Sequence, residues 1–107
     1  MSKAWTVLLL AGLFEIGWPI GMKLAQEPRR VVVGIVIAIV CMAISGFLLY
    51  TAQKSIPVGT AYAVWTGIGA IGTFMVGVLF FNDPVDWLRF LGVAMIICGV
   101  VAMKAAG

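Results

Sequence analysis

Residues 31–50 read VVVGIVIAIVCMAISGFLLY, a run of twenty residues without a single charged side chain. About 20 consecutive apolar residues form a helix long enough to cross the hydrocarbon core of a bilayer. The rest of the chain has the same character, because 64% of the 107 residues are hydrophobic and only 10% are charged. A soluble domain is about a quarter charged. The sequence therefore predicts a protein that resides in a membrane.

Apolar stretches of similar length lie on both sides of this run. The sequence predicts a single all-α transmembrane domain over residues 1–107, with spans at approximately 4–22, 31–50, 58–81 and 87–103. Short polar segments join the spans, so neighbouring helices must alternate in direction. The first span has a glutamate in its middle and no convincing small-x-small cleavage site. We therefore expect it to remain as a helix rather than to be removed as a signal peptide.

Several kinds of chemistry are excluded by what the chain lacks. It contains no histidine, which rules out His-based acid–base catalysis and His-ligated metals. Cys41 and Cys98 lie in apolar runs without CxxC spacing, so we expect packing residues rather than a disulfide or a metal site. No nucleophile–base pair is visible, and we expect neither an enzyme nor a cofactor. The basic residues stand at the ends of spans, as headgroup anchors do, so nucleic-acid binding is not expected.

Basic residues are divided almost equally between the two sides of the membrane. With alternating helices, one side has Lys3, Lys54 and Lys104, and the other has Lys23, Arg29, Arg30 and Arg89. Cytoplasmic loops normally carry an excess of Lys and Arg. Three basic residues on one side against four on the other leave two interpretations of the membrane orientation open. Either the one-charge difference fixes a single orientation, or the chain inserts both ways and identical subunits pair antiparallel.

Glu15 is the one acidic residue inside a predicted span. It lies 11 residues after Ala4, about 16 Å deep at 1.5 Å per residue, which is near the bilayer midplane. A carboxylate there costs a few kcal/mol on insertion scales, so the group either is protonated or meets a cation. A side chain that can do both is what a proton-coupled cation exchanger needs. The alternative is a protonated glutamate that only hydrogen-bonds neighbouring helices.

Residues that follow Glu15 add to this candidate site. Trp18 lies one turn later on the same helix face, and we expect its indole N–H to bond the carboxylate. Pro19 removes the N–H that would bond the Glu15 carbonyl, which leaves an acceptor for a ligand with several N–H groups; a packing kink is the other interpretation. Gly17 and Gly21 form a GxxxG pair, which lets another helix come close.

Three more candidates lie at depth in other spans. Tyr62 and Trp65 are one turn apart on one face of the third span, and Ser45 is the only serine inside the second. A polar cavity with aromatic walls suits a flat cation. By position alone, core packing is equally compatible with the aromatic pair, and a bond to its own helix is equally compatible with Ser45.

The fourth span carries a strip of small residues. Gly92 and Gly99 are seven residues apart, two turns along one face, which favours close contact with another helix. One subunit supplies a single membrane acid and four helices with little room between them for a solute path. We therefore infer an obligate dimer with two glutamates facing a shared space.

The segment GTAYAVWTGIG at residues 59–69, together with four spans and the lone Glu15, resembles the small multidrug resistance family of bacterial transporters. The resemblance covers essentially the whole chain. It implies antiparallel, dual-topology homodimers, multi-pass in the bacterial inner membrane, that exchange protons for cations. Trp18, three residues after Glu15, together with the TGIG segment after Trp65, resembles the guanidinium-exporter branch. The branch that exports quaternary ammonium cations usually has a small residue where Trp18 stands.

The resemblance also implies a role for each candidate residue. Glu15 would be the shared proton and substrate site, the dimer contact would include Gly92 and Gly99, and the wall of the site would be formed by Trp18, Ser45, Tyr62 and Trp65. Pro19 and the first loop, which lacks the family's Gly-Phe pair, depart from the pattern. The expected function is proton-coupled export of guanidinium and small substituted guanidinium cations. The alternatives are a polyspecific exporter of quaternary ammonium or aromatic cations, and a non-transporting or heteromeric membrane subunit.

Overall fold

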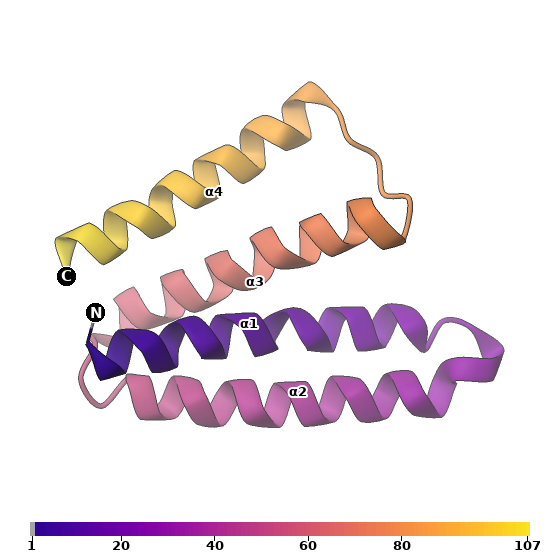
Figure 1. Cartoon of the computed structure of the whole chain (residues 1–107), viewed down its shortest axis with the longest axis horizontal. Helices are drawn as coiled ribbons and strands as arrows, with labels where there is room; N and C mark the ends of the chain where they lie inside the picture. The colour runs from indigo at the N-terminus through magenta and orange to yellow at the C-terminus, as the bar shows by residue number, and fades with distance from the viewer. Residues whose placement is uncertain (1) are drawn as a thin grey trace.

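The computed structural model describes residues 2–107, which fold into long helices (Figure 1). Helix α1 spans Lys3–Leu24, α2 Val31–Ala52, α3 Val58–Phe80 and α4 Trp87–Ala106, and a short 3-10 helix, η1, precedes α2 at Pro28–Arg30. In this described part of the chain, four helices are long and apolar enough to cross a membrane. The prediction of an all-α chain with four helices able to span a membrane is confirmed.

Local sequence signals explain where the helices begin and end. The Ser2 hydroxyl accepts the backbone N–H of Trp5 at 3.3 Å, and the Asp86 carboxylate accepts that of Arg89 at 2.8 Å. Each bond satisfies a donor that has no partner within its helix. After α3, Asn82 has a φ of 56°, a left-handed conformation that asparagine adopts more readily than most residues.

The Asp86 cap depends on pH. The backbone N–H of Arg89, together with its guanidinium group, holds the pKa of the Asp86 carboxyl below its usual range. A carboxyl whose pKa is lowered in the folded state stabilises that state above its ordinary pKa, and the contribution disappears as the pH falls through the lowered value. The start of α4 is therefore capped throughout the neutral range.

Helix α1 lies between α2 and α3 and packs against both, whereas α4 packs against α3 (Figure 1). Near the carboxyl end of α4, Val100 and Met103 contact a buried cluster of the other helices. Toward the loop before Trp87, α4 diverges from α3. None of the residues of α4, all of which the structure describes, is buried. One face of this helix is therefore left uncovered by its own chain.

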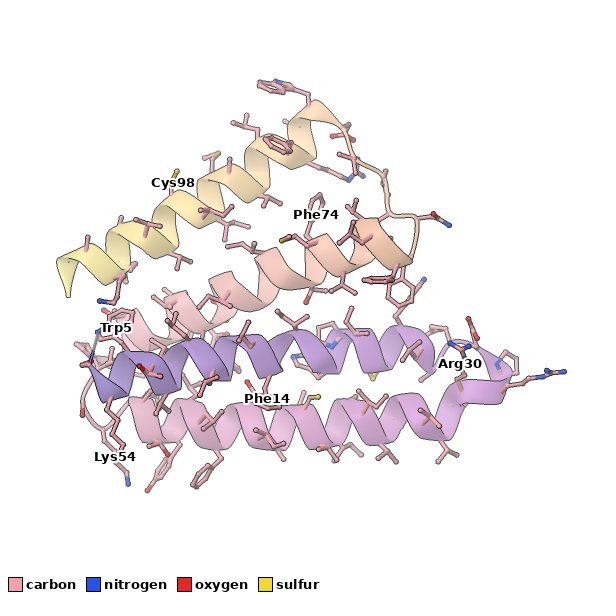
Figure 2. The ribbon with its side chains drawn as sticks, viewed as in Figure 1. Trp5, Phe14, Arg30, Lys54, Phe74 and Cys98 are labelled. Atoms are coloured by element: carbon pink, nitrogen blue, oxygen red, sulfur yellow. The ribbon has the colours of Figure 1, made fainter. Side chains whose placement is uncertain are left out.

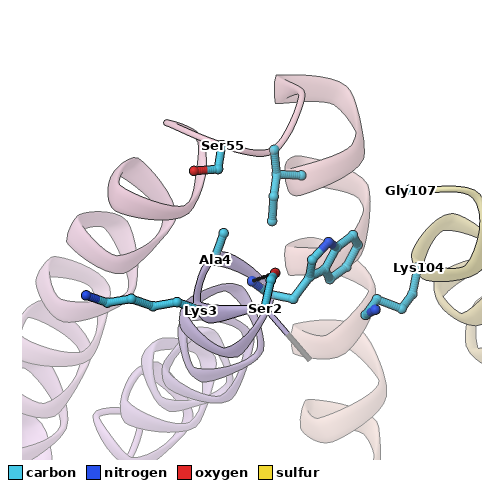
Figure 3. A pocket seen from close by; sticks show the side chains of 8 residues that line it. Ser2, Lys3, Ala4, Ser55, Lys104 and Gly107 are labelled. Carbon is cyan, nitrogen blue, oxygen red and sulfur yellow. Dashed lines mark hydrogen bonds between the residues drawn. The ribbon is translucent and has the colours of Figure 1, made fainter.

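The core lies at the end of the molecule where both termini meet. The cluster contains Trp5, Leu8, Ala52, Ile56, Ala61 and Val64. The Lys104 ammonium lies 4.8 Å from the centre of the Trp5 ring, within cation–π distance. Figure 3 shows Lys3 and Lys104 on either side of an open pocket of about 550 Å³ at this end. Lys3 and Lys104 thus line the open pocket beside the core and are not part of the core itself.

Helices α1 and α2 contact each other backbone to backbone. A Cβ atom on Gly21 would lie 2.6 Å from the carbonyl oxygen of Gly34 and 2.7 Å from the amide nitrogen of Ala38. A Cβ on Gly17 would overlap the side chain of Cys41 in the same seam. The close approach predicted from Gly17 and Gly21 is confirmed. This seam fixes one side of α1, and the other side faces α3.

Candidate functional site

Glu15 lies in the middle of α1, on the side that packs against α3. A Cβ on Gly69 would lie 3.2 Å from the Glu15 Cβ, and closer still to its Cγ. One turn earlier Gly12 lies against Ile68 in the same way. Glycine at position 69 therefore makes the space in which the acidic side chain lies. Gly69 lies within the GTAYAVWTGIG segment, but no signal in the sequence identifies it as a contact of Glu15.

Ser45 connects three helices through a chain of hydrogen bonds. The indole Nε1–H of Trp65 donates to the Ser45 hydroxyl at 2.8 Å, and this hydroxyl donates to the Ala11 carbonyl at 2.7 Å. Ser45 is fully buried, so breaking either bond would leave a buried polar group without a partner. Ala11 and Trp65 each precede the Glu15–Gly69 contact by four residues. The chain therefore lies one helical turn from the acid.

Tyr62 extends this cluster toward the surface. Its ring centre lies 5.5 Å from that of Trp65, with the ring planes at 50°, a tilted arrangement that aromatic pairs favour. Tyr62 is 54% exposed, while Trp65 is partly buried. Because its indole N–H is bound to Ser45, the Trp65 ring has a fixed orientation. The two rings form an aromatic surface that begins one helical turn from the Glu15–Gly69 contact.

Trp18 stands apart from the Ser45 cluster. It lies on α1 one turn beyond Glu15 and two turns beyond Ala11, and it is partly buried. Residues 2–107 contain no hydrogen bond between the Trp18 indole and the Glu15 carboxylate, the bond that the sequence led us to expect. Helix α1 continues through Pro19, which offers no N–H to the Glu15 carbonyl. The structure thus joins Ser45, Tyr62 and Trp65, with Glu15 next to them and Trp18 at the far edge.

The site is not fully enclosed by its own chain. Glu15 is only partly buried, and its neighbour Phe14 is 37% exposed (Figure 2). On α4, a Cβ on Gly92 or Gly99 would meet no described atom within 4 Å. The apolar surface that α4 leaves exposed requires lipid or another protein chain to cover it. Elsewhere in residues 2–107, no three His, Cys, Asp or Glu side chains gather as a metal site would require.

Several known bacterial proteins are similar to this chain. Residues 3–96 match the family profile described as Small Multidrug Resistance protein. A protein of Yersinia pestis named Guanidinium exporter is 45% identical over 103 residues, which cover 96% of this chain and 98% of the relative. Proteins of the same name from Proteus vulgaris and from Escherichia coli (strain K12) are 42% and 40% identical, over 96% and 94% of this chain and 98% and 95% of the relatives. The similarity thus reaches from α1 into α4.

Proposed function

Because the chain belongs to the small multidrug resistance family, we propose that it exports guanidinium and small substituted guanidinium cations across the bacterial inner membrane in exchange for protons. The names of its relatives support the substrate. The single observation that carries the mechanism is the position of Glu15, midway along a membrane-spanning helix, against Gly69 and one turn from the Ser45 cluster. The chain is a multi-pass membrane transporter rather than an enzyme.

Glu15 binds the proton and the substrate alternately in this proposal. A guanidinium ion can direct two parallel N–H bonds to one carboxylate, and such charge-assisted pairs are stronger than neutral hydrogen bonds. Once protonated, the carboxyl group has lost the charge that attracts the cation. One site that holds either ligand, but never both, exchanges one for the other as it faces the two sides of the membrane in turn.

The surrounding side chains select a small planar cation. Trp18, Ser45, Tyr62 and Trp65 form the wall, in which the Trp65 ring is fixed by its bond to Ser45 at 2.8 Å. A fixed aromatic face attracts a flat cation, and the Glu15 carbonyl freed by Pro19 offers one more acceptor for an N–H group. A tetraalkylammonium ion has no N–H group and is bulkier, so this wall disfavours it.

Transport in proteoliposomes tests the proposed substrate. Driven by a proton gradient, the protein should move guanidinium at least about tenfold faster than tetramethylammonium, because the ammonium ion forms no hydrogen bond with the carboxylate. Trp18→Gly should lower this ratio because the loss of the indole enlarges the binding site. Trp87→Gly, at an exposed tryptophan on α4, should leave the ratio unchanged. Equal initial rates for the two cations in the unmodified protein would instead make it an exporter of quaternary ammonium compounds.

We further propose that two copies form an antiparallel homodimer with dual topology. The uncovered face of α4, with Gly92 and Gly99 open along it, supports a helix contact between subunits. The two sets of basic residues lie at opposite ends of the molecule, as Lys54 and Arg30 illustrate in Figure 2. Their nearly equal numbers favour insertion in both orientations. A second copy also supplies a second Glu15 to the shared space.

Topology reporters test this arrangement. When fused after Gly107, a reporter active only in the cytoplasm and one active only in the periplasm should both give signal. Adding two lysines at the same end should shift the mixture, because they raise one side from three basic residues to five. Signal from one side alone would contradict dual insertion. If α4 forms the contact, Gly99→Leu should lower the dimer fraction in detergent, and Gly46→Leu, at an equally open glycine of α2, should not.

A further inference from the structure

A second polar pocket lies where the carboxyl ends of α1 and α3 come together. This pocket, here called the end pocket, has a volume of about 250 Å³ and is lined by Pro19, Ile20, Lys23, Thr73, Gly77, Phe81 and Asp83. Pro19 is one turn beyond Glu15 on α1, and Thr73 is one turn beyond Gly69 on α3. The end pocket therefore starts one turn from the proposed substrate site and leads toward the membrane surface.

The Asp83 side chain folds back over the last turns of α3. Its backbone N–H donates to the Gly77 carbonyl at 3.1 Å. A Cβ on Gly77 would lie 3.0 Å from the Asp83 Cγ, and closer to Oδ2, so glycine is needed for this approach. Helix carboxyl ends carry a partial negative charge, and both α1 and α3 end at this side (Figure 1). The negative charge of Asp83 is thus added to two negative helix ends.

Thr73 adds a polar atom that has no protein partner. Its Oγ1 is buried and, within residues 2–107, forms no hydrogen bond. Buried hydroxyl groups almost always have a partner, so this one is available to a ligand in the end pocket. Phe81 adds an aromatic ring, a surface on which cations bind. The carboxylate, the helix ends, the hydroxyl and the ring together favour a cation with N–H groups.

Lys23 is the positive group that lines the end pocket. It lies in the last turn of α1, where a cation interacts favourably with the helix end. Its ammonium group is attracted to the same carboxylate as an incoming cation, and it repels that cation. Lys23 therefore weakens the binding of a cation in the end pocket, and removing its charge should strengthen that binding.

We infer that the end pocket is a second binding site for guanidinium-type cations, through which substrate passes between the membrane surface and Glu15. This inference rests on the proposed function and assigns one more step to it. Asp83 binds the cation, Thr73 and Phe81 complete its surroundings, and the positive charge of Lys23, which lines the same pocket, lowers the affinity for that cation. At about 30 Å³ per water molecule, a cavity of about 250 Å³ holds the small planar ion together with part of its hydration shell.

Binding at the end pocket can be measured after the inner site has been removed. In a Glu15→Gln background in bicelles, adding guanidinium should shift the backbone amide resonances of Gly77 and Asp83. Asp83→Asn, which keeps the shape of the side chain, should weaken this binding about tenfold because a charge-assisted bond is lost. Lys23→Gln should tighten guanidinium binding about threefold, because it removes a like charge whose effect on the cation is partly screened by solvent. Glu27→Gln, at an exposed acid on the same side, is the control and should change nothing.

Asp83→Asn should weaken guanidinium binding and Lys23→Gln should strengthen it, so either variant alone still tests the inference if the other fails to fold. In the chain with Glu15 intact, Asp83→Asn should raise the KM for guanidinium and Lys23→Gln should lower it. The inference is overturned if guanidinium leaves the Gly77 and Asp83 amides unshifted, if tetramethylammonium shifts them equally, or if Lys23→Gln weakens binding. In each of these cases the unmodified protein would still transport guanidinium. Failure of the proposed function would appear instead as absent guanidinium transport by the unmodified protein.

Discussion

Glu15→Gln is expected to abolish proton-driven guanidinium export, with initial rates lowered by about 100-fold or more. Glutamine keeps the length of the side chain and its packing over Gly69, so membrane insertion and dimerisation should be retained. It has no titratable proton and no negative charge. Losing the charge-assisted bonds to the cation costs about 3 kcal/mol, which corresponds to about 100-fold in binding, and losing the proton site removes the coupling altogether.

Counterflow and uphill transport in proteoliposomes distinguish these two losses. Glu27→Gln is the matched control, because that acid is exposed and pairs with Arg30 at 3.3 Å outside the spans; it should transport like the unmodified protein. If Glu15→Gln still accumulates guanidinium against its gradient when a proton gradient is applied, Glu15 is not the coupling site. A protein that inserts, dimerises and transports nothing is the expected result.

The helices could be predicted because a membrane span requires little beyond length and uniform apolarity. The run from Val31 is the clearest example, and it folds as α2 to Ala52. Hydropathy identifies the part of a helix that fits in lipid, not the place where the helix ends. Helix α4, for instance, continues through Lys104 to Ala106, since lysine and alanine favour helix even where the apolar stretch has ended.

Contacts between helices were harder to predict, because the periodicity of one helix does not indicate what faces it. Ser45 was equally compatible with a bond to its own helix and a place in a cavity. In the structure it instead bonds Ala11 of α1 and Trp65 of α3. Similarly, both cysteines were expected to pack in the interior. Cys41 does lie against Gly17, but Cys98 is exposed on α4, because its own chain leaves that side of the helix uncovered.

The end pocket was missed for the same reason. Thr73 is a polar residue within an apolar span, Gly77 lies one turn later, and Asp83 lies in the next loop. Each has an ordinary explanation by itself, as a helix-bonded hydroxyl, a packing glycine and a turn residue. Only the folded chain brings these three residues together with Lys23 of α1.

A proton and a guanidinium ion must exclude each other if Glu15 binds both. Protonation removes the negative charge, so the apparent affinity for guanidinium should fall as the pH is lowered. Where the carboxyl group is mostly protonated, the loss approaches about tenfold per pH unit, or about 1.4 kcal/mol. Two pH units in that range should therefore weaken binding by about 100-fold. No such dependence should remain in Glu15→Gln, which cannot titrate at this position.

Guanidinium affinity as a function of pH is the measurement that tests this exclusion most directly. The purified protein in detergent would be titrated with guanidinium at several values between about pH 3 and 9, a range that includes the ordinary titration range of a glutamate. Tryptophan fluorescence is the signal, because Trp18 and Trp65 lie within one or two turns of Glu15 along the α1–α3 seam. A dissociation constant that rises toward tenfold per unit as the pH falls is the predicted result for one proton displaced by one cation. A dissociation constant that stays the same across this range would contradict a carboxylate shared by proton and substrate.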